Sequence, residues 1–240
     1  MLKENIWKKY DAVEVSKVLE MGEDYKKFLT VSKTERECNK EIIRRAEEKG
    51  FHNIVDYIKE EKALKPGDKI YADNRGKAVI LFIIGNDSIT NGMNILGAHI
   101  DSPRLDLKAN PLYEDTDFAY FDTHYYGGIK KYQWTTIPLA LHGVIVKKDG
   151  TKIDVNIGEA EDDPVFCITD LLPHLASEQM KKDASKLIEG EALDVLIGNM
   201  PLKGEDKEGV KANVLALLKE KYDISEDDFL SSEIEVVPAG

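Results

Sequence analysis

Two apolar stretches, AVILFIIG at residues 78–85 and NILGA at residues 94–98, decide the fold of this sequence. The first stretch is apolar at successive positions, which is typical of a strand that is covered on both faces. It follows KIYAD at residues 69–73 across an Asn-Arg-Gly turn, so we expect a β-hairpin over residues 69–85. We expect the second stretch to form another buried strand, which a polar loop joins to the first.

Helical patterns precede this hairpin. Ser32 stands three residues before Glu35, and this spacing predicts a capping box at the start of a helix. Apolar residues follow at four-residue spacing, and Gly50 provides a natural end for the helix. Asn53 is expected to cap a second, short helix. Helices followed by buried strands predict the beginning of a layered α/β domain.

The second half of the sequence has the composition of a β-rich domain. Residues 117–157 are rich in Tyr, Thr, Ile and Val. Within them, an Asp-Gly pair at 149–150 predicts a type I′ turn between strands at 139–147 and 152–157. The remaining predicted elements are a strand at 193–197, a helix at 209–222 and a strand at 233–237. We place the domain boundary near residue 108.

Composition limits the function. The 240 residues include 33 Lys and Arg against 45 Asp and Glu, which gives a net charge of −12. Nucleic acids and anionic membranes are bound by basic surfaces, so we expect neither as a partner. Cys38 and Cys167 form no C-x-x-C motif and are typical of thiols in a reducing compartment. The N-terminus has no signal-peptide core, and no apolar run approaches the ~20 residues of a membrane span. We therefore expect a cytoplasmic protein.

The residues best suited to chemistry follow the second apolar stretch, in GAHIDSP at residues 97–103. In an extended strand, His99 and Asp101 would point to the same face. Asp101 could then accept a hydrogen bond from the ring of His99 and fix its tautomer, as carboxylates do for metal-binding histidines. The ends of strands in open α/β sheets are also common ligand sites. The alternative is a chance surface pair, because an H-x-D tripeptide is short.

The other candidate residues favour structural roles. His142 lies in a strand-like run and is expected to pack in the core. His174 is flanked by apolar residues and, taken alone, is expected to be a packed or turn histidine. The acidic run at 159–163 is expected to be a solvated loop, with Ca²⁺ binding as the alternative. Tyrosines at 120, 125, 126 and 132 are expected on the sheet surface or at an interface.

Several segments together carry a resemblance to a known family. They are DKIYADNRGK at 68–77, GAHIDSPRLDLK at 97–108, YGG at 126–128, DVLIG at 194–198 and EIEVVPAG at 233–240. In this order they resemble the M18 family of metalloaminopeptidases, which includes the aspartyl aminopeptidases and aminopeptidase I. Because the segments extend over nearly the whole chain, the resemblance is more specific than the H-x-D tripeptide.

The resemblance implies a fold and an activity. Residues 1–108 would be the N-terminal part of a zinc-exopeptidase α/β domain, and residues 109–240 an inserted, β-rich, barrel-like oligomerisation domain. The protein would use two zinc ions to remove N-terminal residues from peptides, and it would form a homo-oligomer. His99 matches a zinc ligand, and Asp101 matches the aspartate that orients it. His174 matches a histidine that binds substrate in the active site of a neighbouring subunit.

The sequence departs from the family pattern in two ways. WTTIPL at 134–139 stands where the better-known branch has a Trp and an Asp-Arg-Asp-Leu element, so the sequence resembles the bacterial-type branch and gives no substrate preference. The family's remaining ligands and general base lie beyond the position of Gly240, so we expect an incomplete and inactive portion of the enzyme. Two other hypotheses stay open: a non-catalytic assembly module, and an unrelated binding protein with an accidental H-x-D.

Overall fold

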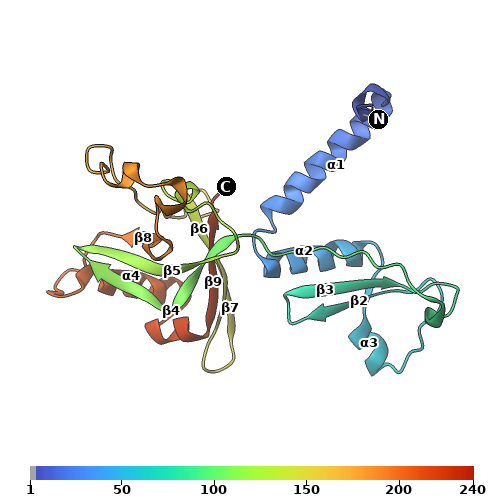
Figure 1. Ribbon diagram of the computed structural model, residues 1–240. Coiled ribbons are helices and arrows are strands. Elements are labelled where there is room, and N and C mark those ends of the chain that lie inside the picture. Colours follow the sequence, from blue (N-terminus) through green and yellow to red (C-terminus); the bar gives the residue numbers. More distant parts are fainter. Residues whose placement is uncertain (1–3) are drawn as a thin grey trace. The chain divides into compact units, whose positions relative to one another are not determined.

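The computed structural model describes residues 4–240, and the chain divides into two compact units, Met1–Asp101 and Ser102–Gly240. Residues 1–3, which belong to the stretch where we expect no signal peptide, lie outside the described residues. Figure 1 shows the helices and strands of both units.

The first unit combines three α-helices with a small sheet. Its elements in chain order are η1 (Ile6–Lys8), α1 (Ala12–Thr30), α2 (Glu35–Glu48), β1 (His52–Asn53), α3 (Ile54–Lys59), β2 (Lys69–Asn74), β3 (Ala78–Ile83) and η2 (Ile89–Asn91). β1 pairs with β2 in parallel, and β2 pairs with β3 as an antiparallel hairpin. α2 packs against β2 and β3, as Figure 1 shows.

The helix starts follow local side-chain chemistry. α2 has the predicted capping box two residues later than expected, because Thr34 rather than Ser32 is its N-cap. The Thr34 hydroxyl accepts the Glu37 backbone N–H at 3.3 Å, and a Glu37 carboxylate oxygen accepts the Thr34 N–H at 3.1 Å. This register places both Glu35 and Glu37 in the first turn, where acidic groups favour the helix dipole. Asn53 caps α3 as predicted.

The hairpin forms as predicted, but its burial was predicted wrongly. β3 is largely exposed, with Ile80 and Ile83 at 69% and 58% of their full accessibility. Residues 94–98 form no strand, and Leu96 is fully exposed. A strand is buried on both faces only where other layers cover both, and α2 is the helix that packs against β3. Within residues 4–240 no strand pairs with the 94–98 segment.

The second unit is built on a six-stranded sheet in the order β7-β6-β9-β4-β5-β8, with antiparallel neighbours throughout. Its strands are β4 (Arg104–Asp115), β5 (Phe118–Tyr126), β6 (Leu139–Val146), β7 (Lys152–Ile157), β8 (Val195–Gly198) and β9 (Ser232–Pro238). Its helices are α4 (Gly209–Tyr222) and the short η3 (Lys131–Gln133), η4 (Gln179–Lys181), η5 (Ala184–Lys186), η6 (Gly190–Ala192) and η7 (Glu226–Ser231). α4 packs on β4, β5 and β8.

Most of the predicted elements of this unit are present. The β6–β7 hairpin, α4, β8 and β9 lie where the sequence places them, whereas the long strand β4 was not predicted. The prediction of a type I′ turn is wrong, because Gly150 has a positive φ of 86° and Asp149 does not. A type I′ turn needs positive φ at both central residues.

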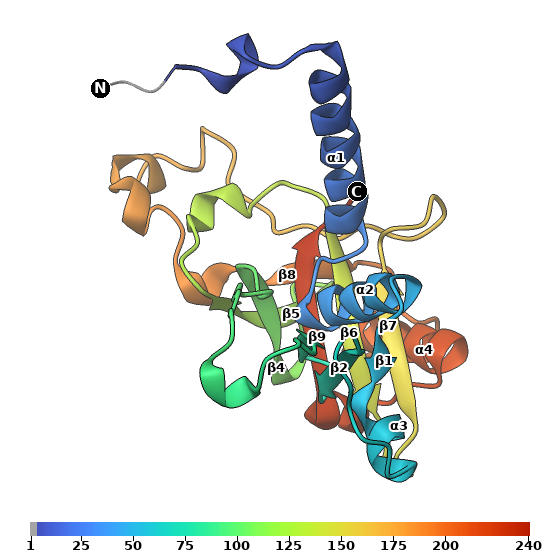
Figure 2. The same ribbon diagram turned by 90° about the vertical axis from the view of Figure 1, so that its right-hand side faces the viewer.

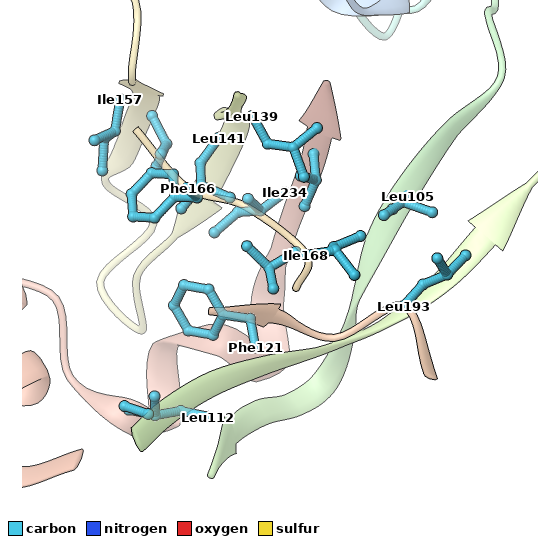
Figure 3. Packing of buried hydrophobic residues seen from close by; sticks show 14 of the residues in the cluster. Leu105, Leu112, Phe121, Leu139, Leu141, Ile157, Phe166, Ile168, Leu193 and Ile234 are labelled. Atoms are coloured by element: carbon cyan, nitrogen blue, oxygen red, sulfur yellow. The ribbon is translucent and has the colours of Figure 1, made fainter. Parts of the chain in front are cut away.

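The core of the second unit lies against one face of this sheet. Figure 3 shows apolar side chains from β4, β5, β6, β7 and β9 pointing toward one another and toward the segment that carries Phe166 and Ile168. Leu105, Leu139 and Leu193 are fully buried there. Burying a side chain of this size contributes about 1.5–3 kcal/mol.

The sheet is open, so the barrel-like description is not confirmed. Its end strands β7 and β8 do not pair with each other. Phe166 and Cys167 make isolated bridges to Leu139 of β6 and Leu196 of β8, and a ladder of full strands would be needed to close the barrel.

β6 and β9 approach each other closely at Gly143. Its Cα partner on β9 is Ile234, and its φ is 153°. A Cβ atom at Gly143 would lie 2.0 Å from the Glu233 carbonyl oxygen and 2.8 Å from the Ile234 Cα. The backbones therefore leave no room for a side chain at this position.

Among the helices of residues 4–240, none combines the length and the apolar character that crossing a bilayer requires.

Candidate active site

His99 and Asp101 lie in an irregular segment at the end of the first unit. Nδ1 of His99 lies 3.1 Å from Oδ1 of Asp101 and 3.0 Å from its backbone oxygen. Two acceptors at Nδ1 assign the ring proton to that nitrogen, which leaves the lone pair on Nε2. The His99 side chain is 85% exposed, and Nε2 has no hydrogen-bond partner in the described chain.

The predicted contact thus forms without the predicted strand. Residues 97–103 have no regular secondary structure. The side chains meet in this irregular segment because Nδ1 of His99 reaches both the backbone oxygen and the carboxylate Oδ1 of Asp101. A Cβ atom at Gly97 would meet nothing within 4 Å, so the space beside the segment is open.

The donor set fits one zinc ligand with its orienting carboxylate. A neutral imidazole with a free Nε2 is a good ligand for zinc, and a carboxylate on the other nitrogen is the usual support. Within residues 4–240 the structure gathers no group of three or more His, Cys, Asp or Glu side chains that could hold a metal ion. Catalytic zinc usually takes three ligands from protein, so His99 would need further ligands.

His174 is exposed in a turn rather than packed. The turn at residues 173–175 is held by a hydrogen bond from the Ala176 N–H to the Leu172 carbonyl at 3.0 Å. The neighbouring Leu171, Leu172 and Leu175 are also more than half exposed, while Ala176 is buried. His174 makes no hydrogen bond to the part of the chain that the structure describes. Its ring is therefore open to an external partner.

His142 is buried in β6, as predicted, but within a polar cluster. Its Nε2 lies 2.9 Å from Glu159, and its Cα partner on β9 is Glu235. Glu235 pairs in turn with Arg104 of β4, whose Nε lies 3.2 Å from its carboxylate and 2.8 Å from that of Asp106. These contacts connect β6, β9 and β4 across the sheet.

Arg104 and Glu235 were not singled out from the sequence. A charged residue between apolar neighbours, as in Ile234-Glu235-Val236, is the signal that could have found them. The guanidinium of Arg104 also lies 4.1 Å from the centre of the Tyr126 ring. The cluster pairs buried charges inside the sheet, and within the described residues it gathers no set of metal ligands.

The acidic run at 159–163 behaves as a turn. The Asp163 carboxylate accepts the N–H groups of Gly158 and Ala160 at 3.0 and 3.2 Å. These hydrogen bonds, that from Gly158 first, lower the pKa of Asp163 below its usual value. Glu161 and Asp162 are exposed, as expected for a solvated loop.

Known proteins resemble this chain in both sequence and structure. The family model described as Aminopeptidase I zinc metalloprotease (M18) matches residues 28–240. The probable M18 family aminopeptidase 1 of Clostridium acetobutylicum is 59% identical over 243 residues, across 100% of this chain and 52% of its own length. The crystal structure of the M18 aminopeptidase from Thermotoga maritima matches with a TM-score of 0.91 at 47% identity, covering 99% of this chain and 51% of that one.

A more distant likeness concerns the fold alone. The S. cerevisiae mApe1 dodecamer matches with a TM-score of 0.60 at 15% identity, covering 91% of this chain and 48% of that one.

The matches define a class of zinc metalloproteases whose related structures share this two-unit fold. Within that class, the chain belongs to the M18 aminopeptidase family. The resemblance seen in the sequence is therefore confirmed, and the hypothesis of an unrelated binding protein is wrong. The chain spans about half the length of the curated relatives it matches.

Proposed function

We propose that this chain forms part of a zinc-dependent aminopeptidase, a hydrolase that removes N-terminal residues from peptides. The observation that carries the proposal is the His99–Asp101 contact, which holds the imidazole with Nε2 exposed. Family membership supports the reaction class, because the relatives carry the name aminopeptidase.

In this proposal His99 is a zinc ligand and Asp101 orients it. Zinc, when bound, polarises the scissile carbonyl and activates a water molecule, and two ions would share this task. Asp101 accepts a hydrogen bond from the Nδ1–H group of His99, so the lone pair of Nε2 stays available to the metal. The remaining ligands would come from parts of the relatives' length that this chain does not span.

The two domains expected from the sequence, with their boundary near residue 108, would have separate tasks. Residues 1–108 would contribute to the catalytic α/β domain, and residues 109–240 would form an inserted domain for assembly into a homo-oligomer. The dodecameric form of the distant mApe1 structure supports assembly as the task of this fold. The free thiols Cys38 and Cys167 support a reducing, cytoplasmic location.

His174 would act across a subunit boundary. Its exposed ring on the 173–175 turn has no partner within the described part of its own chain, as a residue offered to another subunit requires. There it would contact the peptide and donate a hydrogen bond to the oxyanion that forms during attack. Loss of one such donor typically costs about 10²–10³-fold in rate.

The test of the metal site uses a protein of the relatives' full length that carries this sequence. His99→Ala should remove one zinc ion and nearly all turnover, and Asp101→Asn should lower metal affinity or rate by about 10–100-fold. His52→Ala is the matched control, because His52 is an exposed histidine of the same unit. Zinc content by atomic emission and peptide turnover are measured together. Normal zinc and normal rate in His99→Ala would overturn the proposal.

The test of His174 is complementation between inactive variants. His99→Ala and His174→Ala should each be nearly inactive, and mixed oligomers should regain activity because some sites take an intact residue from each subunit. If the two variants co-assemble and no activity returns, His174 has only a structural role in its turn.

The 240-residue chain by itself should show no turnover, even with added zinc, because the described residues hold no cluster of three metal ligands. Chelator-sensitive turnover by this chain would contradict that expectation. Tight, stoichiometric zinc in the full-length protein would separate the peptidase from the second hypothesis, a non-catalytic assembly module.

A further inference from the structure

A cavity of about 430 Å³ opens in the second unit and is lined by residues of that unit alone. Figure 2 shows the orange part of the chain that carries η4 to η6 near the yellow-green part that carries η3. The residues that line the cavity are Lys131, Lys182, Ser185, Lys186, Ile188, Glu189 and Gly190. All of them belong to residues 102–240, so the cavity is formed inside one unit.

The charge of this cavity is opposite to that of the chain. Three lysines line it against a single carboxylate, although the whole chain carries a net charge of −12. The Lys182 ammonium lies 3.5 Å from Glu189. Lys131 and Lys186 form no ion pair with any residue that the structure describes. By contrast, Lys108 is held by Asp122 at 2.8 Å and by Glu191 at 2.7 Å.

Three positive charges that line one cavity with a single carboxylate repel one another, and an anion between Lys131 and Lys186 would relieve that repulsion. Hydrogen bonds from ammonium groups to oxyanions are short and stronger than neutral ones. The Ser185 side chain adds a hydroxyl donor to the wall. This set of donors fits an anion with several oxygen atoms.

One part of the cavity wall, at Gly190, packs closely against the ring of Tyr125. A Cβ atom at Gly190 would lie 2.5 Å from Cε1 of Tyr125, so the ring sits directly against the glycine backbone. The Lys131 ammonium lies 5.7 Å from the centre of the same ring, which orients this lysine. Ile188 is buried and supplies an apolar surface.

A second cavity of about 330 Å³ shares Lys182, Ile188 and Glu189 with the first. It adds hydroxyl and amide groups from Thr135, Thr169 and Gln179, and the carboxylate of Asp170, which accepts a hydrogen bond from the Gln179 amide at 2.8 Å. The first cavity alone, at about 430 Å³, is larger than a single inorganic phosphate needs. It fits an organic molecule whose anionic end lies among the lysines.

We propose that this lysine-lined cavity binds a small multivalent oxyanion, a phosphate ester or a polycarboxylate. The site is independent of the proposed peptidase reaction, since it uses neither His99 nor His174. Its occupancy would pair Lys131 and Lys186 and stabilise the irregular segment between β7 and β8.

The test measures binding of pyrophosphate and of citrate to the 240-residue chain by isothermal titration calorimetry, at constant ionic strength. Lys131→Gln and Lys186→Gln should each weaken binding by about 10-fold, and the double variant should abolish it. Lys152→Gln is the matched control, because Lys152 is an exposed lysine of β7, away from the cavity. Lys186→Arg keeps the charge and should retain binding.

Each outcome decides the proposal. Binding of pyrophosphate alone assigns a phosphate ester, and binding of citrate alone assigns a polycarboxylate. Failure of both anions to bind up to about 10 mM overturns the site. Equal affinity of the double variant and the native chain, with unchanged far-UV circular dichroism, also overturns it.

Discussion

At the scale of single residues, Gly143 gives the sharpest stability prediction. An alanine Cβ there would lie 2.0 Å from the Glu233 carbonyl oxygen, and backbone atoms cannot rotate away as a side chain can. We expect Gly143→Ala to lower the free energy of unfolding by about 3 kcal/mol or more, since overpacking and backbone strain add. Urea denaturation followed by circular dichroism measures this change.

The control for this prediction is Gly150→Ala. Gly150 also has a positive φ, 86°, but a Cβ atom there would meet nothing within 4 Å. Its cost therefore reports backbone conformation alone, at about 1–2 kcal/mol. If the two variants were equally stable, the close approach of β6 and β9 would have no energetic consequence.

The sequence predicts individual residues well where the chemistry is local. The contact of His99 with Asp101 follows from a two-residue spacing, and Asn53 as a cap follows from the helix that begins beside it. The Arg104–Glu235 pair could not be predicted, because Glu235 comes from a strand far away in the chain, and the Glu159 partner of His142 lies in the loop after β7. The exposure of His174 likewise depends on which segments cover its turn.

At the scale of elements, α2 contains a charge cluster that makes its stability depend on pH. Glu41 accepts hydrogen bonds from Arg44 at 2.7 Å and from Arg45 at 2.6 Å. These contacts, that with Arg44 first, lower the pKa of Glu41 from its ordinary value of 4.5 to about 2. A depressed carboxylate pKa stabilises the folded state above the unfolded value, and this contribution is lost as the pH falls through the folded value.

We therefore expect the protection of α2 against amide hydrogen exchange to fall between about pH 4.5 and pH 2. Glu41→Gln should already lack this contribution at neutral pH, so its protection should change less across that range. Glu23→Gln in α1 is the control, because the Glu23–Lys26 pair is exposed to water and is screened. Identical pH profiles for native protein and Glu41→Gln would contradict the prediction.

The elements show where periodicity succeeds and where it fails. The β2–β3 hairpin, α3, α4 and the β6–β7 hairpin follow from local patterns of apolar and turn residues. The 94–98 stretch has the same apolar character, yet it forms no strand because none of the described strands pairs with it. Apolar composition indicates that a segment favours burial, whereas a β-strand forms only where a neighbouring strand pairs with it.

At the scale of the whole molecule, the second unit contains its own sheet and core. All six strands and the apolar cluster in Figure 3 belong to residues 102–240. We expect a chain of residues 102–240 alone to fold cooperatively, because its buried side chains need no residue of the first unit. Urea denaturation with a single transition and a β-rich circular dichroism spectrum would check this expectation.

A destabilised core provides the control for that measurement. Leu139→Ala in the isolated unit should lower the free energy of unfolding by about 2–5 kcal/mol, because Leu139 is fully buried. Leu217→Ala should change it little, since Leu217 is 55% exposed. A non-cooperative transition in the native 102–240 chain would show that its core depends on the first unit.

The arrangement of the strands could not be predicted from local patterns. β9 lies between β6 and β4, so the centre of the sheet is formed by the last strand of the chain. Neither turn residues nor apolar periodicity predicts this strand order, because the order follows from contacts between segments that are distant in the chain. Composition alone indicated the division into an α/β part and a β-rich part, and the family resemblance implies the same division.

The exposed outer face and edge of β3 have a consequence for the colloidal behaviour of the chain. β3 ends the order β1-β2-β3, and among residues 4–240 no strand pairs with its outer edge. Such an edge, with apolar Ile80 and Ile83 beside it, is a template for pairing with another chain. The net charge of −12 makes the molecules repel one another at low salt. Added salt screens this repulsion, and at about 0.1 M ionic strength the Debye length is about 10 Å. Concentrated solutions of this chain should therefore scatter more light as salt is added.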